Sequence, residues 1–272
     1  MKYIIKTRAE RLKFQKTELF SKLRKLKTSM GLNSIWSVGS LMNLCQKSKA
    51  DNFYEWENYY FKSGKKRNGL VKRMTPEKQR LMNTYFLNEE EMKDVKTLLS
   101  FKERTINMKH GRKLEELFEM GEMLYEEWKK HGYEYISIND CVNFIYISVV
   151  DIAWMGYARE KNTIAQLHKK FHWLSFRKSL DKEDIEFAVD YKIVRAGKLL
   201  GAIQIKSEKE LRNPSKGLKK GKQYPSKNVR RAIEKSKVFA EKENVPVLFV
   251  YAEEHGKIVN KNVIRQIYKL CA

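Results

Sequence analysis

Two short polar stretches, on either side of Gly197, contain the side chains of this chain that could do chemistry. Asp190 lies before this turn glycine, and Gln204 and Lys206 lie after it. A hairpin centred on Gly197 places Asp190 opposite Gln204, and strand alternation puts Gln204 and Lys206 on one face of the sheet. Carboxylate and amide oxygens suit a hard cation such as Mg²⁺. The spacing indicates a metal site, although the solvated face of an edge strand would show the same pattern.

The arrangement resembles the core of the PD-(D/E)xK nucleases, where an Asp on one strand faces an acid, an apolar residue and a Lys on the next. The resemblance implies Mg²⁺ bound by Asp190, Gln204 and the carbonyl of Ile205, with Lys206 beside the attacking water. The chain departs from the pattern in two ways: an amide replaces the second acid, and the segment 188–190 contains no proline. A neutral amide leaves less negative charge at the metal site.

A predicted helix upstream offers another carboxylate. Gly156, Glu160, Ile164 and Leu167 follow helical spacing, which places Glu160 on the face that also carries packing residues. A helical glycine costs about 1 kcal/mol relative to alanine, and close approach of the helix to the sheet would explain it. We therefore predict that Glu160 is an additional metal ligand or positions the water. The alternative is an ordinary carboxylate at the rim of the fold.

Several segments together resemble the MjaI-type restriction endonucleases, over about residues 35–255. They are Trp36–Leu41, Phe53–Phe61, the Gly156/Glu160 helix, Asp184–Asp190 and Gly201–Lys206. The resemblance implies a type II enzyme that cuts both strands of a short palindromic DNA site with Mg²⁺, as a homodimer. Base specificity does not follow from these core motifs, because bases are read elsewhere.

Charge and composition favour a nucleic acid as the partner. The 272 residues include 56 Lys and Arg against 33 Asp and Glu, a net charge of +23, which exceeds what solubility requires. Three widely spaced cysteines suggest neither disulfides nor a zinc ribbon, which suits the cytoplasm. The chain begins without a signal-peptide pattern. Its most apolar stretch, Cys141–Ala158, carries Asn143 and Asp151, so we expect a buried helix and no membrane partner.

The basic segment after the second strand supplies candidate phosphate contacts. These are Lys216, Lys219, Lys220, Lys222, Lys227, Arg230 and Arg231. A solvated basic surface is the alternative interpretation of any one of them. Residues 1–80 carry +14 of the net charge and include a helix predicted over residues 19–30. Its basic face could face solvent around a packed apolar stripe, lie on phosphates or lie on a membrane surface.

The periodicity predicts an α/β core, and the resemblance implies the restriction-endonuclease type of this class, a central mixed sheet flanked by helices. We expect a basic, mainly helical region at 1–140 that recognises DNA, and the catalytic core at 141–272. Helices are predicted near 113–130, 144–170 and 228–243, and strands at 187–194, 199–206 and 245–251, the last joined by a crossover. Residues 62–69 are predicted as a basic loop after the aromatic segment 51–61.

Two other functions fit the same residues. A DNA repair or junction nuclease could use the same core without sequence-specific cleavage. A non-catalytic nucleic-acid-binding protein could use the positive charge alone, with the Asp190/Gln204/Lys206 face as a coincidence. Incubation with duplex DNA and Mg²⁺, beside a chelator control, separates the enzymes from the binding protein.

Overall fold

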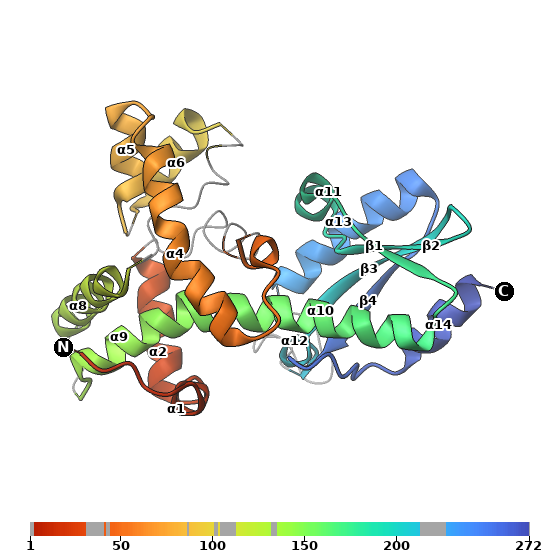
Figure 1. Ribbon diagram of the computed structural model, residues 1–272, viewed down its shortest axis with the longest axis horizontal. Coiled ribbons are helices and arrows are strands. Elements are labelled where there is room, and N and C mark those ends of the chain that lie inside the picture. The colour runs from red at the N-terminus through yellow and green to blue at the C-terminus, as the bar shows by residue number, and fades with distance from the viewer. Residues whose placement is uncertain are drawn as a thin grey trace, which may run out of the picture. The chain divides into compact units, whose positions relative to one another are not determined.

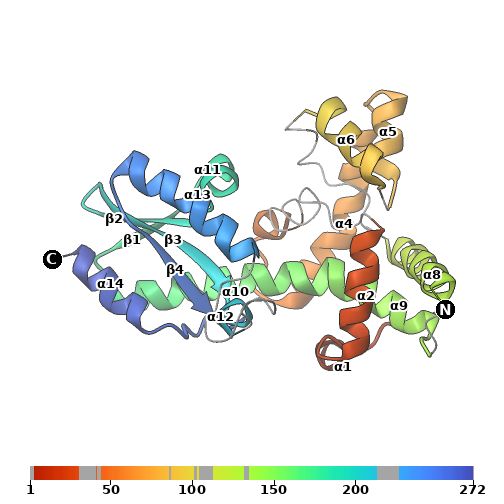
Figure 2. The same cartoon turned by 180° about the vertical axis from the view of Figure 1, so that it is seen from behind.

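The computed structural model describes residues 3–30, 41, 44–85, 87–100, 103, 113–131, 135–212 and 227–271 (Figure 1). The chain divides into two compact units, Met1–Tyr157 and Ala158–Ala272. The division falls inside one helix, α10 (Ile152–Lys170). The same elements are seen from behind in Figure 2.

The described part of the first unit consists of helices. They are α1 (Arg8–Phe14), α2 (Glu18–Ser29), α4 (Phe53–Val71), α5 (Pro76–Asn83), α6 (Glu89–Leu98), α8 (Leu114–Lys130), α9 (Ile138–Tyr146) and the π-helical turn η1 (Ile147–Asp151). Helix α8 packs closely on α9, since a Cβ at Gly121 would lie 2.7 Å from the Cα of Val142. Glycine is thus required there for close approach and not for an unusual backbone angle.

The predicted basic loop at 62–69 is wrong, because α4 continues through it. Tyr60, Gly64, Arg67 and Val71 are buried at helical spacing, so the basic residues between them occupy the solvent side of an amphipathic helix. The loop was predicted from the glycines and lysines of this segment, whereas the helical spacing of its buried residues determines the structure.

Helices α9, η1 and α10 form one continuous helix, Ile138–Lys170, which begins earlier than the predicted residue 144. By length and composition alone it could cross a membrane, but 72% of its most apolar window is buried inside the protein. This confirms the prediction of a buried helix. The indole of Trp56 donates to the backbone carbonyl of Val150, inside the π turn, at 3.0 Å.

In the described part of the second unit, four strands form a mixed sheet in the order β1-β2-β3-β4. The strands are β1 (Ser175–Lys178), β2 (Tyr191–Arg195), β3 (Lys198–Ser207) and β4 (Val247–Ala252). The first three are antiparallel neighbours, and β4 lies parallel to β3. Helix α13 (Lys227–Glu243) lies between β3 and β4 in the chain, as the predicted crossover requires. The expected α/β class with a mixed sheet and flanking helices is confirmed.

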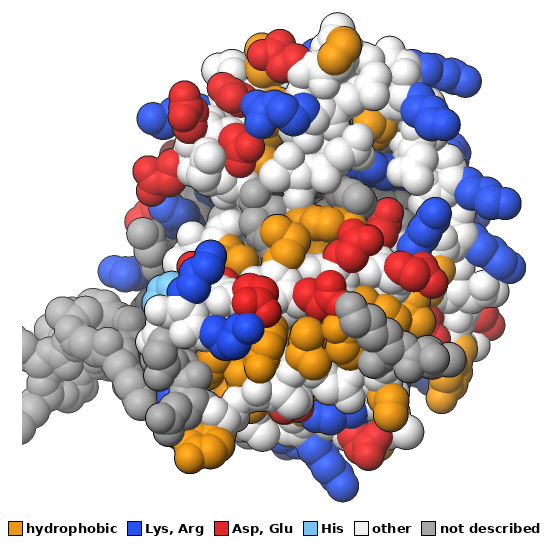
Figure 3. Space-filling view, turned by 90° about the vertical axis from the view of Figure 1, so that its left-hand side faces the viewer, with side chains coloured by type: hydrophobic (Ala, Val, Ile, Leu, Met, Phe, Trp, Pro, Cys, Tyr) orange, Lys and Arg blue, Asp and Glu red, His pale blue; other side chains and the backbone are white. Residues whose placement is uncertain are grey.

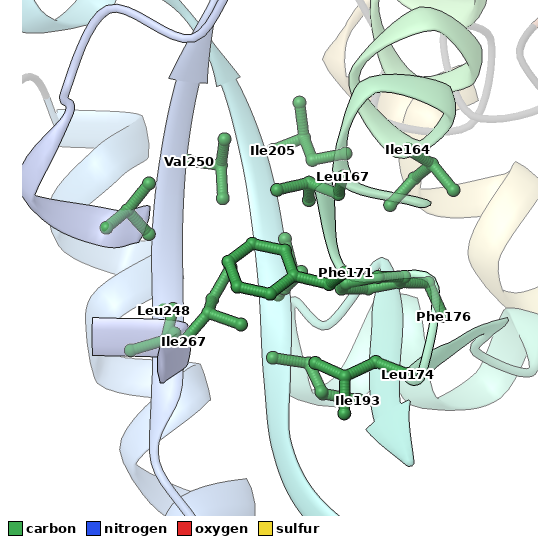
Figure 4. Packing of buried hydrophobic residues seen from close by; sticks show 12 residues of the cluster. Ile164, Leu167, Phe171, Leu174, Phe176, Ile193, Ile205, Leu248, Val250 and Ile267 are labelled. Carbon is green, nitrogen blue, oxygen red and sulfur yellow. The ribbon is translucent and has the colours of Figure 1, made fainter. Parts of the chain in front are cut away.

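Helices cover both faces of the sheet. On one face, α10 and α14 (Asn262–Leu270) contribute Leu167, Phe171 and Ile267 to a core that includes Ile203 and Ile205 of β3 (Figure 4). On the other face, α11 (Asp181–Phe187) and α13 pack through a smaller cluster that includes Ala202, Val189 and Phe239. A short helix, α12 (Glu208–Arg212), follows β3.

The predicted strand at 187–194 starts too early. Residues up to Phe187 belong to α11, which ends at Ala188 in the left-handed conformation (φ 52°). Strand β2 begins three residues later, at Tyr191. Strand β1 has no counterpart among the predicted strands, because two of its four residues are charged and it shows no continuous apolar run.

Candidate active site

The hairpin that carries the predicted site turns at Ala196-Gly197. Both residues have positive φ, 48° and 80°, which is the type I′ combination whose twist matches that of the flanking strands. The turn therefore has two central residues and pairs Arg195 with Lys198. The expectation of a turn centred on Gly197 is wrong by half a residue.

A β-bulge between Ile193 and Val194 corrects this difference. Each bulge adds one residue to one strand and shifts the pairing beyond it. After the bulge, the backbone N–H of Asp190 donates to the carbonyl of Ile203 at 2.8 Å, which brings Asp190 opposite Gln204. The expected pair is formed by a feature that the sequence analysis did not include.

Asp190 and Gln204 meet directly in the protein interior. The Gln204 Nε2 donates to Asp190 Oδ2 at 2.7 Å, and the backbone N–H of Ile205 donates to the same oxygen at 2.6 Å. Asp190 is 4% exposed and Gln204 is 5% exposed. Because a strand N–H lies in the plane of its sheet, the carboxylate occupies the fork where β2 stops pairing with β3.

Two further oxygen atoms belong to this fork. The Gln204 Oε1 is buried and has no hydrogen-bond partner among the described residues. The N–H and C=O of one strand residue point to the same edge, so the Ile205 carbonyl is directed to the fork that its N–H shares with Asp190. A buried polar atom without a partner is costly and indicates a missing ion or water. Carboxylate, amide and carbonyl oxygens are the donors that a hard cation takes.

Glu160 reaches the site from α10, but it is bound to another residue. Its Oε2 lies 2.9 Å from the Nζ of Lys178, at the end of β1. The Lys178 ammonium also lies 4.8 Å from the centre of the Tyr191 ring, its neighbour across the strands. Sequence analysis did not identify Lys178, because β1 was not predicted.

Asp184 of α11 is another residue that sequence analysis did not place in the site. Its charge raises the pKa of Asp190, and its carbonyl accepts from the N–H of Ala188 where the helix ends. Burial and then the charge of Glu160 raise its pKa, against the charges of Lys178 and Lys206. The only local signal was its spacing, six residues before Asp190 in the segment that resembles the endonuclease family.

The electrostatics of the site are those of crowded carboxylates. Burial raises the pKa of Asp190 well above its ordinary value, and the charges of Glu160 and Asp184 raise it further. Burial acts to lower the pKa of Lys178, but Glu160 and Asp190 outweigh it and the pKa is raised. The neighbouring carboxylates therefore disfavour the ionised forms of Asp184 and Asp190, and a cation at this position would be stabilised.

Lys206 completes the group of predicted residues. It follows Gln204 by two positions on β3, pairs in register with Tyr251 of β4 and is half-buried. Among the described residues, no three His, Cys, Asp or Glu side chains stand close enough to hold a metal ion by themselves. A cation would therefore need the amide and carbonyl oxygens as well as Asp190.

The predicted phosphate contacts are only partly described. Lys216, Lys219, Lys220 and Lys222 lie outside the described residues, as does the side chain of Lys227, whose backbone begins α13. Arg230 and Arg231 are exposed on α13. On the face of the molecule in Figure 3, several Lys and Arg side chains follow one another along the right-hand edge, whereas acidic side chains lie mainly at the upper left and in the centre.

Comparison with known proteins agrees with these features. The family model described as MjaI restriction endonuclease matches residues 23–260, which include α10, the hairpin and β4. No curated protein and no solved structure gave a significant match. Because the match covers most of the 272 residues, the chain belongs to the MjaI restriction endonuclease family.

Proposed function

We propose that this protein is a type II restriction endonuclease that uses Mg²⁺ to hydrolyse both strands of a short palindromic site in double-stranded DNA. The observation that carries the proposal is the buried Gln204 Oε1, which has no partner among the described residues and belongs to the amide bound to Asp190. The family of the chain supports DNA as the substrate.

Three groups would hold the metal: the carboxylate of Asp190, the amide oxygen of Gln204 and the carbonyl of Ile205. Bound Mg²⁺ supplies Lewis-acid stabilisation of charge on the scissile phosphate. Two hydrogen bonds to Oδ2 fix the Asp190 carboxylate for this role. The fork thus orients its donors before any cation arrives.

Lys206 would act on the water and the phosphate. Its position two residues beyond Gln204 places it on the same strand face. An ammonium there can orient the attacking water and offset the negative charge that develops on the phosphate. Glu160 would contribute a further carboxylate once it is released from Lys178.

Plasmid cleavage tests the metal requirement. Wild-type protein should convert a plasmid to discrete fragments with Mg²⁺ and leave it intact with EDTA. The Asp190→Ala and Lys206→Ala variants should bind the same DNA without cleaving it, because phosphate contacts dominate affinity. Binding without cleavage by the wild-type protein would indicate a non-catalytic binding protein. Cleavage without sequence preference would indicate a repair-type nuclease.

The homodimer has its own test, since one Asp190/Lys206 centre attacks one phosphodiester and a palindrome offers two that are related by a twofold axis. Wild-type subunits mixed with an excess of Lys206→Ala subunits should yield nicked circles, because each mixed dimer keeps one working centre. Double-strand breaks by a protein that sediments as a monomer on DNA would contradict the dimer.

A further inference from the structure

Lys178 is the residue of this site to which the proposed function gives no role. Its ammonium lies 2.9 Å from Glu160 Oε2, and the side chains are 33% and 16% exposed respectively. Both residues are presented by rigid elements, the last position of β1 and the middle of α10. This ion pair is thus partly removed from water, where charges interact more strongly than at an open surface.

Lys178 reaches this position because of the pairing between β1 and β2. In register it lies beside Tyr191, and the next residue, Ser179, donates its N–H to the carbonyl of Asp190 at 3.0 Å. Phe176, two residues before Lys178 on the same strand face, packs in the core that α10 covers. The ammonium is therefore held between α10 and the end of β2.

The charges around Lys178 are those that a metal ion would also meet. Glu160 and Asp190 are the two carboxylates that act most strongly on it, and its charge in turn opposes the raised pKa values of Asp184 and Asp190. In the structure, one positive charge thus partly neutralises three carboxylates. The ion pair with Lys178 occupies Oε2 of Glu160, one of the two oxygens that Glu160 would offer to a metal ion.

We propose that Lys178 is a resident counter-ion that competes with the divalent metal for Glu160, so that it sets the metal concentration at which the site is occupied. The inference rests on the proposed function, because it concerns the same metal site. Glu160 exchanges Lys178 for the metal, and no covalent bond is formed or broken. Without the ammonium, the carboxylates would stabilise the metal alone and would bind it more tightly.

The test measures metal binding without DNA and without catalysis. The thermal unfolding midpoint of the purified protein is followed during a titration with Ca²⁺, a hard cation that takes the same oxygen ligands, because ligands that bind the native state raise it. In Lys178→Met, we expect half-saturation at about a tenfold lower Ca²⁺ concentration than in the wild type, the order expected for removing one nearby charge at a partly screened site. Isothermal titration with Mg²⁺ should show the same change.

Lys192 provides a matched control on the next strand. Its Nζ lies 2.6 Å from Glu183 Oε1, and the two side chains are 28% and 21% exposed, close to the values for Lys178 and Glu160. Lys192→Met should leave the half-saturation point unchanged. Lys178→Arg, which keeps the positive charge, should also bind Ca²⁺ like the wild type. Lys178→Gln replaces Lys178→Met if the latter shows no cooperative thermal transition, with the same expected change.

A second variant separates this inference from the proposed function. If Lys178 acts through Glu160, then Lys178→Met should bring no gain in a Glu160→Gln background, which is the coupling that a double-mutant cycle measures. Asp190→Asn should abolish binding in every background. One outcome would overturn the role of Lys178 and leave the metal site intact. In it, the wild type binds the metal, Asp190→Asn does not, and Lys178→Met binds no more tightly than the wild type. Two other outcomes would overturn the proposed metal site as well as the role of Lys178. They are metal binding by Asp190→Asn that equals wild-type binding, and no metal binding by the wild type, Lys178→Met or Lys178→Arg.

Discussion

The first unit holds a buried ion pair that differs in kind from the Lys178–Glu160 pair of the candidate active site. Arg11 of α1 and Asp151 of η1 are 4% and 1% exposed and make a bidentate contact at 2.7 and 3.0 Å. The third guanidinium nitrogen of Arg11 donates to the carbonyl of Lys6 at 2.7 Å, and the Cζ atom of Arg11 lies 4.4 Å from the centre of the Tyr146 ring. Every nitrogen of this guanidinium has a partner.

The site around Asp190 has the opposite character. Glu160, Asp184 and Asp190 act on one another as like charges, and the Gln204 amide oxygen has no partner among the described residues. Such an arrangement costs stability in the metal-free protein. The Arg11 pair therefore links α1 to η1 within the first unit, whereas under the proposed function the carboxylates of the second unit await an ion.

Asp190→Ala should cause the largest change in this comparison. We expect cleavage to fall by about 1,000-fold or more, because metal stabilisation of the transition state is worth several kcal/mol. The metal-free protein should lose some stability in urea, because the Gln204 amide and the Ile205 N–H lose their acceptor in the interior. Glu186→Ala, an exposed acid of the same helix as Asp184, is the control and should cut like the wild type. Wild-type cleavage by Asp190→Ala would exclude Asp190 from the mechanism.

Arg11→Met tests whether the Arg11–Asp151 ion pair contributes to the stability of the fold. Removal of one partner leaves Asp151 charged in the interior, so the free energy of unfolding should fall by about 3–5 kcal/mol. Urea denaturation measures it. Lys22→Ala, which breaks the exposed Lys22–Glu18 pair at 3.2 Å, should cost less than about 0.5 kcal/mol. A similar loss of stability in Arg11→Met and Lys22→Ala would show that burial does not make the Arg11–Asp151 pair more important than a surface pair.

Gln204→Glu should make the protein more dependent on bound metal for its stability. The variant loses the N–H that Asp190 accepts and gains a like charge, so without metal its unfolding midpoint should fall, by the equivalent of about 1–3 kcal/mol. Mg²⁺ should restore the midpoint, and cleavage should persist at a lower Mg²⁺ concentration than the wild type needs. Loss of the cooperative transition in Mg²⁺ as well would identify Gln204 as a structural amide.

The smallest effect concerns a surface pair of the first unit, Lys78 and Glu103, at 2.8 Å. Hydrogen bonds from Lys78 and from Ser100 lower the pKa of Glu103 from 4.5 to about 2. A lowered carboxyl pKa contributes stability that is fully present above pH 4.5 and is lost as the pH falls toward 2. Glu103→Gln should therefore be less stable than the wild type by about 1 kcal/mol at pH 7, and the difference should vanish in urea titrations near pH 2. A difference that does not change with pH would contradict this origin.

Much of the site could be predicted from the sequence because its residues lie close together in the chain. The turn glycine, the strand period and the Asp190/Gln204/Lys206 spacing are local properties, and a hairpin converts them into contacts between neighbouring strands. The helix that carries Glu160 has a period of the same local kind. These features also identified the family that residues 23–260 match.

The tertiary structure alone decided which charges face one another. Lys178 meets Glu160 because β1 pairs with β2 beside α10, and Asp184 meets Asp190 because α11 ends in a left-handed residue. Arg11 meets Asp151 across 140 residues of chain. Periodicity tells which face of an element is apolar, but it does not tell which elements pack together. Whether a buried charge is matched or left for an ion depends on that packing, because electrostatic energy is determined by distance and burial and not by separation along the chain.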